Sequence, residues 1–246
     1  MVAAASEDVR ARNPPRWGLG DAVGGWALAY GAAAVFGTIL LAVFGYTGDA
    51  ARFERLPLTM IALQYPPLWL GFVAVPVWAA ATKGRGAVRD FHLYIRPVDV
   101  PLGVIFGLIA QFVLVPLVSL PVLKVAGKDV EDLARPAREL ADKANGVGGV
   151  VLFAVIVAIG APIAEELFFR GLVLRSVEKR FTLWWGVAVS SVVFGASHFE
   201  ALQMPALIVA GAVFAVLAVR TARLGPAIIA HMTFNAATVV TLVANR

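Results

Sequence analysis

Long apolar runs separated by short polar segments dominate this chain of 246 residues. A run of roughly 18 or more apolar residues is long enough to cross a bilayer as a helix. Such runs occur at about 22–45, 58–81, 98–123, 148–170, 183–199, 203–219 and 225–243. We therefore predict an all-α, polytopic integral membrane helix bundle of about seven transmembrane helices, forming a single membrane domain over residues 22–246.

Basic residues are unevenly shared among the polar segments between these runs. Lys and Arg exceed the acids after the second, fourth and sixth runs, and Arg10, Arg12 and Arg16 precede the first; the fifth loop has neither. Because cytoplasmic loops carry the basic excess, this alternation places the N-terminus in the cytoplasm and the C-terminus outside. Residues 1–21 are interpreted as a cytosolic tail, with a short interfacial helix over residues 3–12 as the alternative.

The third loop, residues 124–147, balances acids and bases, and Leu133, Ala137 and Leu140 share one helical face within it. This pattern predicts an interfacial helix interrupted by Pro136. It is interpreted as a solvated surface helix, and a substrate gate is the more specific alternative.

Composition supports a membrane protein and narrows its partners. The chain is 60% hydrophobic and only 15% charged, whereas soluble domains carry about 25% charged residues. The net charge of +5 falls in loops next to lipid headgroups, so we expect the lipid bilayer as a partner and no nucleic acid. The absence of cysteine excludes disulfides, a thiol nucleophile and a thiolate metal site. The Ala- and Val-rich chain indicates a bacterial cytoplasmic membrane.

Six polar residues interrupt the last apolar runs: Glu165, Glu166, Arg170, His198, His231 and Asn235. A charged group at the centre of a bilayer costs at least about 2.5–3.5 kcal/mol, so such groups usually have a function. Counting from the run ends at about 1.5 Å per residue, Glu165, His198, His231 and Asn235 fall at similar depths. The sequence therefore predicts a polar site inside the bundle.

Helical spacing indicates distinct roles for the two acids. Glu166 and Arg170 are four residues apart on one face and should form an ion pair. Glu165 is turned about 100° away and stays free to act as a general base on water. His198 could share that water or hold the base.

His231 and Asn235 are also four residues apart, and their side chains could donate to a developing oxyanion. Alternatively, Glu165, His198 and His231 could ligate a Zn²⁺ ion that leaves one position open for water. The simpler alternatives are structural, with Glu166–Arg170 as a strut, the histidines as packing residues and Asn235 joining two helices.

Other protease chemistries lack their patterns in this sequence. It contains no His-Glu-x-x-His, no Asp in the middle of an apolar run and no Gly-x-Ser-x-Gly elbow.

The three polar motifs resemble those of the CPBP intramembrane proteases, the CAAX-processing and bacteriocin-protection group. Glu165-Glu166-Leu-Phe-Phe-Arg170 resembles the family's Glu-Glu-x-x-x-Arg motif, Phe194-Gly-Ala-Ser-His198 its Phe-x-x-x-His motif, and His231-Met-Thr-Phe-Asn235 its His-x-x-x-Asn motif. The resemblance covers residues 148–243, which would be the catalytic core. It implies a membrane endopeptidase, customarily called a metalloprotease. Glu165 and His198 would activate water, and His231 with Asn235 would bind the oxyanion.

The leading hypothesis is an intramembrane endopeptidase that acts on a membrane-associated protein or peptide. The main alternative is a non-catalytic membrane immunity or adaptor protein that uses the polar cluster for packing or partner binding. A proton-coupled transporter is a third hypothesis, disfavoured because the sequence shows no inverted repeat.

Overall fold

The computed structural model describes residues 15–245, and all regular elements in that range are helices. Most of the predicted cytosolic tail, and the alternative helix over residues 3–12, lie outside the described residues. The first described helix, α2 (Leu19–Val43), begins inside the predicted tail. Residues just before it are also held, because the amide of Arg16 donates to the carbonyl of Lys83 over 2.6 Å.

Six helices of the described chain are long and apolar enough to span a membrane. They cover Leu19–Val43, Leu58–Lys83, Asp99–Ala126, Gly146–Arg180, Met204–Thr221 and Gly225–Ala244. A seventh apolar helix, α12 (Leu183–Ala196), has 14 residues, which extend for about 21 Å. The polytopic helical bundle is confirmed, but the predicted run 183–199 is too short for a hydrocarbon core of about 30 Å, since the chain turns after Ala196.

Several spanning helices are built from consecutive segments. The second consists of α3 (Leu58–Ala62) and α4 (Tyr65–Lys83). The third consists of α6 (Asp99–Ile109), η3 (Ala110–Leu114) and α7 (Val115–Ala126). The fourth extends past its predicted end at residue 170, through α9 (Gly146–Ala154), η4 (Val155–Gly160), α10 (Ala161–Glu166), η5 (Leu167–Val173) and α11 (Leu174–Arg180).

The remaining helices complete the bundle and its connections. The last two spanning helices are α13 (Met204–Thr221) and α14 (Gly225–Ala244). Short elements lie in the loops: η1 (Gly48–Ala51), η2 (Phe53–Arg55), α5 (Ala87–Asp90) and α8 (Val130–Asp142). As predicted, the third loop is helical, and Leu140 is buried against neighbouring helices. Pro136 lies inside α8 without interrupting it, which corrects the prediction.

The segments η3, η4 and η5 are π-helical. A proline has no N–H, and its ring clashes with the carbonyl four residues earlier, so it disrupts an α-helix at that point. Pro116 and Pro162 stand four residues after Phe112 and Ala158, which lie within η3 and η4. The two π segments η4 and η5 enclose α10, the segment that carries both glutamates. Such widened turns are frequent at functional sites.

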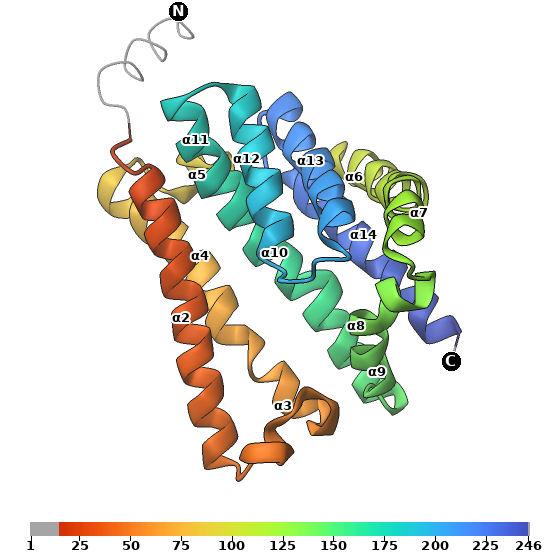
Figure 1. Ribbon diagram of the computed structural model, residues 1–246. Coiled ribbons are helices and arrows are strands. Elements are labelled where there is room, and N and C mark those ends of the chain that lie inside the picture. Colours follow the sequence, from red (N-terminus) through yellow and green to blue (C-terminus); the bar gives the residue numbers. More distant parts are fainter. Residues whose placement is uncertain (1–14, 246) are drawn as a thin grey trace, which may run out of the picture.

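The basic loops gather at one end of the bundle, where α5 and α11 lie in Figure 1. Hydrogen bonds join these segments, since the Lys179 ammonium donates to the carbonyl of Trp17 and the amide of Leu224 donates to the carbonyl of His92. The elements α3, α8 and α9 lie at the opposite end, near the C-terminus. The fold therefore brings together the segments that the charge alternation assigns to one side of the membrane.

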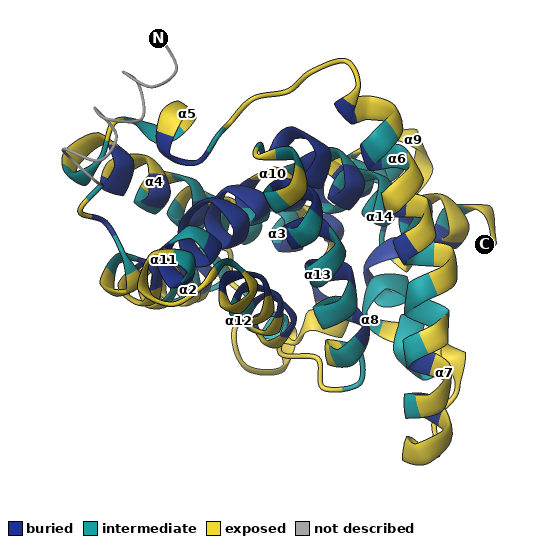
Figure 2. Cartoon of the chain, turned by 90° about the horizontal axis from the view of Figure 1, so that it is seen from above, coloured by how far each residue is buried: buried dark blue, intermediate teal, exposed yellow. Residues whose placement is uncertain are grey.

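Close helix contacts pack the interior of the bundle. A Cβ atom at Gly103 or Gly107 of α6 would lie within 2.6 Å of an atom in α14, so only glycine permits this approach. Figure 2 shows that buried residues gather on the inward sides of the helices, and exposed residues lie on the periphery. Because lipid covers that periphery in a membrane protein, its many apolar side chains are expected there.

Candidate active site

The two glutamates of α10 have different surroundings. Glu166 is fully buried and accepts a hydrogen bond from Arg170, with 2.7 Å between Oε1 and Nη1. Glu165 keeps 14% of its side chain exposed, and no hydrogen bond to its carboxylate is present among residues 15–245. The predicted i, i+4 ion pair is present, and it belongs to Glu166 rather than to its neighbour.

Arg170 is fully buried and is held from several sides. Its Nη2 donates to the carbonyl of Gly211 over 2.9 Å, and its guanidinium lies 4.4 Å from the ring centre of Phe194 and 5.5 Å from that of Phe214. A Cβ atom at position 211 would stand 3.1 Å from Nη2, so a glycine here lets α13 approach the charge. Ring faces and a carbonyl therefore replace water around the cation.

His231 connects the two acids across the interior. Its Nδ1 lies 2.8 Å from Oε1 of Glu166, and its Nε2 lies 3.8 Å from Oε2 of Glu165. Because an ionised carboxylate only accepts hydrogen bonds, Nδ1 carries the proton in the contact with Glu166. The imidazole also stacks on Phe214, with ring centres 4.7 Å apart. The buried pair Glu166–Arg170 thus orients His231 so that its other nitrogen faces Glu165.

His198 lies in the turn after α12 and does not contact the glutamates directly. Its Nδ1 stands 2.8 Å from the carbonyl of Phe194, and no hydrogen bond or ion pair joins His198 to Glu165 in the described part of the chain. The Phe194 ring contacts both histidines edge to face, with its centre 4.9 Å from the ring of His198 and 5.4 Å from that of His231. Phe194, the first residue of the Phe-x-x-x-His motif, thus packs against both.

Asn235 faces the fourth spanning helix, on the same side of α14 as His231. Its amide donates to the carbonyl of Val157 over 2.7 Å. Val157 belongs to η4, and a π turn leaves carbonyls available for side-chain donors. This contact joins α14 to η4, which is the structural role weighed for Asn235, and it occupies one of its two amide hydrogens.

The predicted zinc ligands do not form a metal-binding group as they lie. Among residues 15–245, no three His, Cys, Asp or Glu side chains come close enough to hold a metal ion. Nδ1 of His231 is committed to Glu166, and Nδ1 of His198 to a backbone carbonyl. A zinc site formed by Glu165, His198 and His231 would need these side chains to move.

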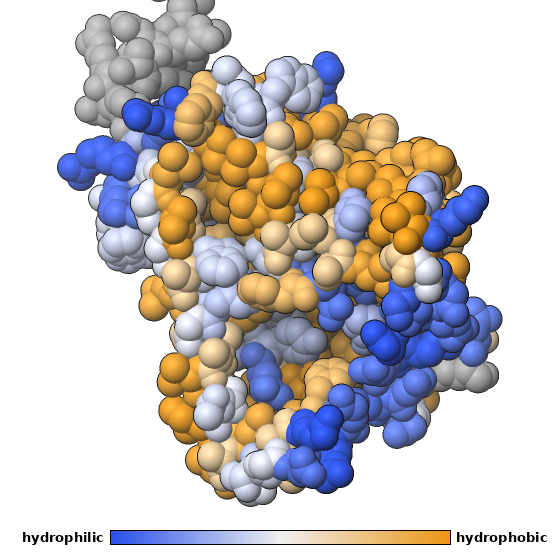
Figure 3. Space-filling model, in the orientation of Figure 1, coloured by the Kyte–Doolittle hydropathy of each residue, from blue (hydrophilic) through white to orange (hydrophobic). Residues whose placement is uncertain are grey.

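Several residues of the site were not predicted from the sequence. Ser197, next to His198, accepts a hydrogen bond from Tyr30 of α2. Tyr30 lies in a helix distant in sequence, so no local motif marks it. Figure 3 shows a hollow on the face between α2 and the charged surface of α8, where water or a peptide could approach.

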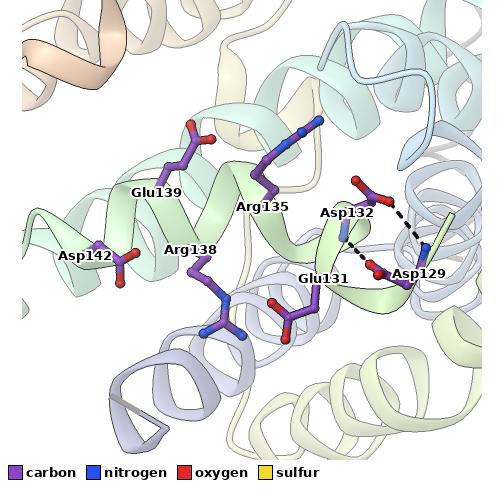
Figure 4. A pocket seen from close by; sticks show the side chains of 7 residues that line it. All are labelled: Asp129, Glu131, Asp132, Arg135, Arg138, Glu139 and Asp142. Carbon is purple, nitrogen blue, oxygen red and sulfur yellow. Dashed lines mark hydrogen bonds between the residues drawn. The ribbon is translucent and has the colours of Figure 1, made fainter.

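Charged residues of α8 line a separate pocket, drawn in Figure 4. Asp129 caps the start of this helix by accepting from the amide of Asp132 over 2.9 Å. None of the six polar residues predicted for the site lines this pocket: its side chains are Asp129, Glu131, Asp132, Arg135, Arg138, Glu139 and Asp142. We therefore place the candidate chemistry at α10 and α14.

The site lies within a segment that resembles known membrane peptidases. Residues 147–237 match the family described as "Type II CAAX prenyl endopeptidase Rce1-like", and this segment contains all three polar motifs. Over these residues, which make up less than half of the chain, it resembles the Rce1-like family. The resemblance to CPBP membrane proteases stated from the motifs is thereby confirmed.

Two curated relatives share part of the chain. A Bacillus subtilis (strain 168) protein, "Putative membrane peptidase YdiL", is 29% identical over 94 residues, which cover 38% of this chain and 38% of the relative. An uncharacterised 24.3 kDa protein of Escherichia coli is 30% identical over 108 residues, which cover 41% of this chain and 50% of the relative. The chain therefore spans half or less of these relatives. No solved structure matches it significantly.

Proposed function

We propose that this protein is a membrane-embedded endopeptidase that cleaves a membrane-associated protein or peptide with an activated water. The observation that carries the proposal is the arrangement around His231. Glu166 and Arg170, fully buried together, hold one nitrogen of this imidazole, and the other faces a carboxylate that has no hydrogen-bond partner in the described chain. A helix-packing cluster would not require a second carboxylate that accepts no hydrogen bond from the described residues.

In this proposal Glu165 is the general base. It takes a proton from a water molecule while the water oxygen bonds to the carbonyl carbon of the scissile peptide. The carbonyl electrons move to oxygen. In this step His231 acts as the imidazolium, with Nδ1 donating to Glu166, so that Nε2 and the second amide hydrogen of Asn235 can donate to the resulting oxyanion. When the tetrahedral intermediate collapses, the C–N bond breaks, and Glu165 returns its proton to the leaving amine. His198 contributes Nε2, since its Nδ1 donates to a carbonyl, and can orient the attacking water.

Glu166 and Arg170 support the reaction without taking part in proton transfer. Their pair fixes the position of His231, and burial keeps water from competing for it. No step of this proposal passes through a metal ion, because the His, Asp and Glu side chains of residues 15–245 do not gather into a metal-binding group.

The proposal also assigns an orientation. The charge alternation and the shared basic end favour a cytoplasmic N-terminus in a bacterial cytoplasmic membrane. Single cysteines introduced at Arg89, exposed on α5, and at Glu131, exposed on α8, would test it, since the parent sequence contains no cysteine. An impermeant thiol reagent added outside intact cells should label the second and spare the first. The reverse pattern would invert the orientation.

Proteolysis itself can be tested with purified protein in liposomes. We would add a mixture of membrane-protein-derived peptides and identify new termini by mass spectrometry. The wild type and Glu54→Gln, a change of an exposed loop acid, should produce the same cleavages, and Glu165→Gln should produce none. If the wild type cleaves nothing but binds a membrane partner through this site, the immunity or adaptor hypothesis would replace the proposal.

A further inference from the structure

The turn that carries His198 has an unusual backbone. Phe199, the next residue, adopts φ of +56°, a left-handed conformation disfavoured for a residue with a Cβ atom. Such a conformation persists where the surroundings hold it. The centre of the Phe199 ring lies 5.4 Å from that of the Tyr30 ring, edge to face, and 6.3 Å from that of the Trp26 ring. Two aromatic side chains of α2 thus pack against the residue that follows His198.

The residue before His198 is held by the same two side chains. The hydroxyl of Tyr30 donates to the carbonyl of Ser197 over 2.5 Å, and Nε1 of Trp26 donates to its Oγ over 2.8 Å. The Ser197 hydroxyl in turn donates to the carbonyl of Val193 over 2.6 Å. Trp26 and Tyr30 are four residues apart on one face of α2, and their rings are 4.7 Å apart. Both chain neighbours of His198 are therefore fixed from a single helix.

The contacts at Ser197 and Phe199 influence the direction in which Nε2 of His198 points. The Nδ1 contact with the Phe194 carbonyl sets the tautomer. The position of Nε2 then depends on where the turn places the Cα atom, which the contacts at Ser197 and Phe199 determine. We propose that Trp26 and Tyr30 of α2 are positioning residues for His198. Both lie outside the family-matched segment, residues 147–237, so the site is completed by a helix that the family resemblance does not cover.

The contribution of this inference to turnover rests on the proposed function, but its structural part can be measured independently. The chain has three histidines, at positions 92, 198 and 231. We would label them with ¹⁵N in detergent-solubilised full-length protein, and assign the His198 signal by comparison with His198→Gln. The signal should show protonation at Nδ1. Tyr30→Phe, which removes only the hydroxyl, should shift or broaden it and leave the His231 signal in place.

The same variant should lower kcat about five- to tenfold with KM unchanged, as expected for the loss of one aligning hydrogen bond. Trp26→Phe combined with Tyr30→Phe should lower kcat further. Tyr46→Phe is the matched control, because this tyrosine follows α2 and its hydroxyl has no hydrogen bond in the described chain. It should change neither the spectrum nor the kinetics.

The possible failures are distinguishable. If the wild type hydrolyses peptides, and Tyr30→Phe matches it in kcat and in the His198 signal, positioning by α2 is wrong and the proposed function stands. If no preparation hydrolyses a peptide but the His198 signal responds selectively, the proposed function fails and positioning stands. Equal shifts of all three histidine signals in Tyr30→Phe would show a general loss of structure and overturn the specific role.

Discussion

Two buried arginine–carboxylate pairs, one in the bundle interior and one at a helix end, have different surroundings. At the start of α6, Asp99 is fully buried and receives three side-chain hydrogen bonds from Arg223, two from Nε at 2.8 and 3.0 Å and one from Nη2. It also accepts one from the amide of Arg96. In the interior, Glu166 and Arg170 make one direct hydrogen bond. Oε2 of Glu166 and Nε of Arg170 are buried and have no hydrogen-bond partner among the described residues.

This difference indicates that the Asp99–Arg223 pair only joins helices, as a helix clamp, whereas the Glu166–Arg170 pair belongs to the candidate active site. Both oxygens of Asp99 are satisfied, and Arg223 stays 13% exposed, so this pair ties α6 to the loop before α14 with little unmet polarity. The interior pair keeps unmet polar atoms and uses Oε1 of Glu166 for both Arg170 and His231. Buried groups without partners are uncommon and call for an explanation. Orienting His231 beside Glu165 provides one.

The largest expected effect is at Glu165, the acid that the interior pair leaves free. Glu165→Gln keeps the shape of the side chain and removes the base, so turnover should fall by about 10²–10⁴-fold. Thermal unfolding in detergent should change little, because no hydrogen bond to Glu165 is lost. Peptide turnover and melting temperature on one preparation would check this. Retained turnover in Glu165→Gln would remove Glu165 from the proposed mechanism.

His231 tests whether the interior pair acts through the imidazole. If the imidazolium form of His231 donates from Nε2 to the oxyanion, His231→Ala should lower turnover by about 10²–10³-fold at similar KM. Asn235→Ala should lower turnover as well, but it also breaks the contact with Val157, so a loss of about 1 kcal/mol of stability should accompany it. If Asn235→Ala reduced stability while turnover per folded molecule stayed at the wild-type level, Asn235 would be a helix-joining residue only.

The sequence predicts more of this site's composition than of its geometry. Periodicity and run length identify the helices, and i, i+4 spacing identifies the partners Glu166 and Arg170, because both depend on local chain geometry. The contact of His231 with Glu166 depends on how α14 rotates against α10. That rotation is set by contacts across the bundle, such as Gly103 and Gly107 against α14.

Contacts with helices distant in sequence explain the other differences between the predicted and the observed helix ends. The predicted span 183–199 is shortened because the chain turns at Ser197, where Trp26 and Tyr30 hold it. No local pattern around residue 197 reports those partners, which are more than 160 residues away. The continuation of the fourth helix to Arg180 also depends on packing, since α11 lies against α12.

The two pairs should also differ in stability. Glu166→Gln leaves Arg170 fully buried without its counter-charge, and breaking a buried pair in this way costs about 3–5 kcal/mol. Asp99→Asn should cost less, about 1.5–3 kcal/mol, because Arg223 at the helix end can be hydrated. Reversible unfolding in mixed detergent would measure both. A larger loss of stability from Asp99→Asn than from Glu166→Gln would contradict this ranking and show that the interior pair contributes less to stability than the pair at the helix end.

Activity should separate the same two variants in parallel. Asp99→Asn should retain wild-type turnover per folded molecule, since Asp99 contacts no residue of the proposed site. Glu166→Gln should lose turnover even where the protein remains folded, because His231 loses the acceptor that orients it. Equal turnover in the two variants would contradict the distinction between clamp and site.

The smallest expected effect concerns metal removal. Nδ1 of His231 is used by Glu166, and Nδ1 of His198 by the carbonyl of Phe194, so protein groups already orient both histidines. Chelation of the purified protein should therefore leave turnover unchanged, and His231→Ala should not alter its zinc content. Metal content and turnover must be measured on the same preparation before and after chelation. Stoichiometric zinc, whose removal abolishes turnover and whose return restores it, would show instead that Glu165, His198 and His231 move together around a metal, and that the pair Glu166–Arg170 orients a zinc ligand rather than an oxyanion donor.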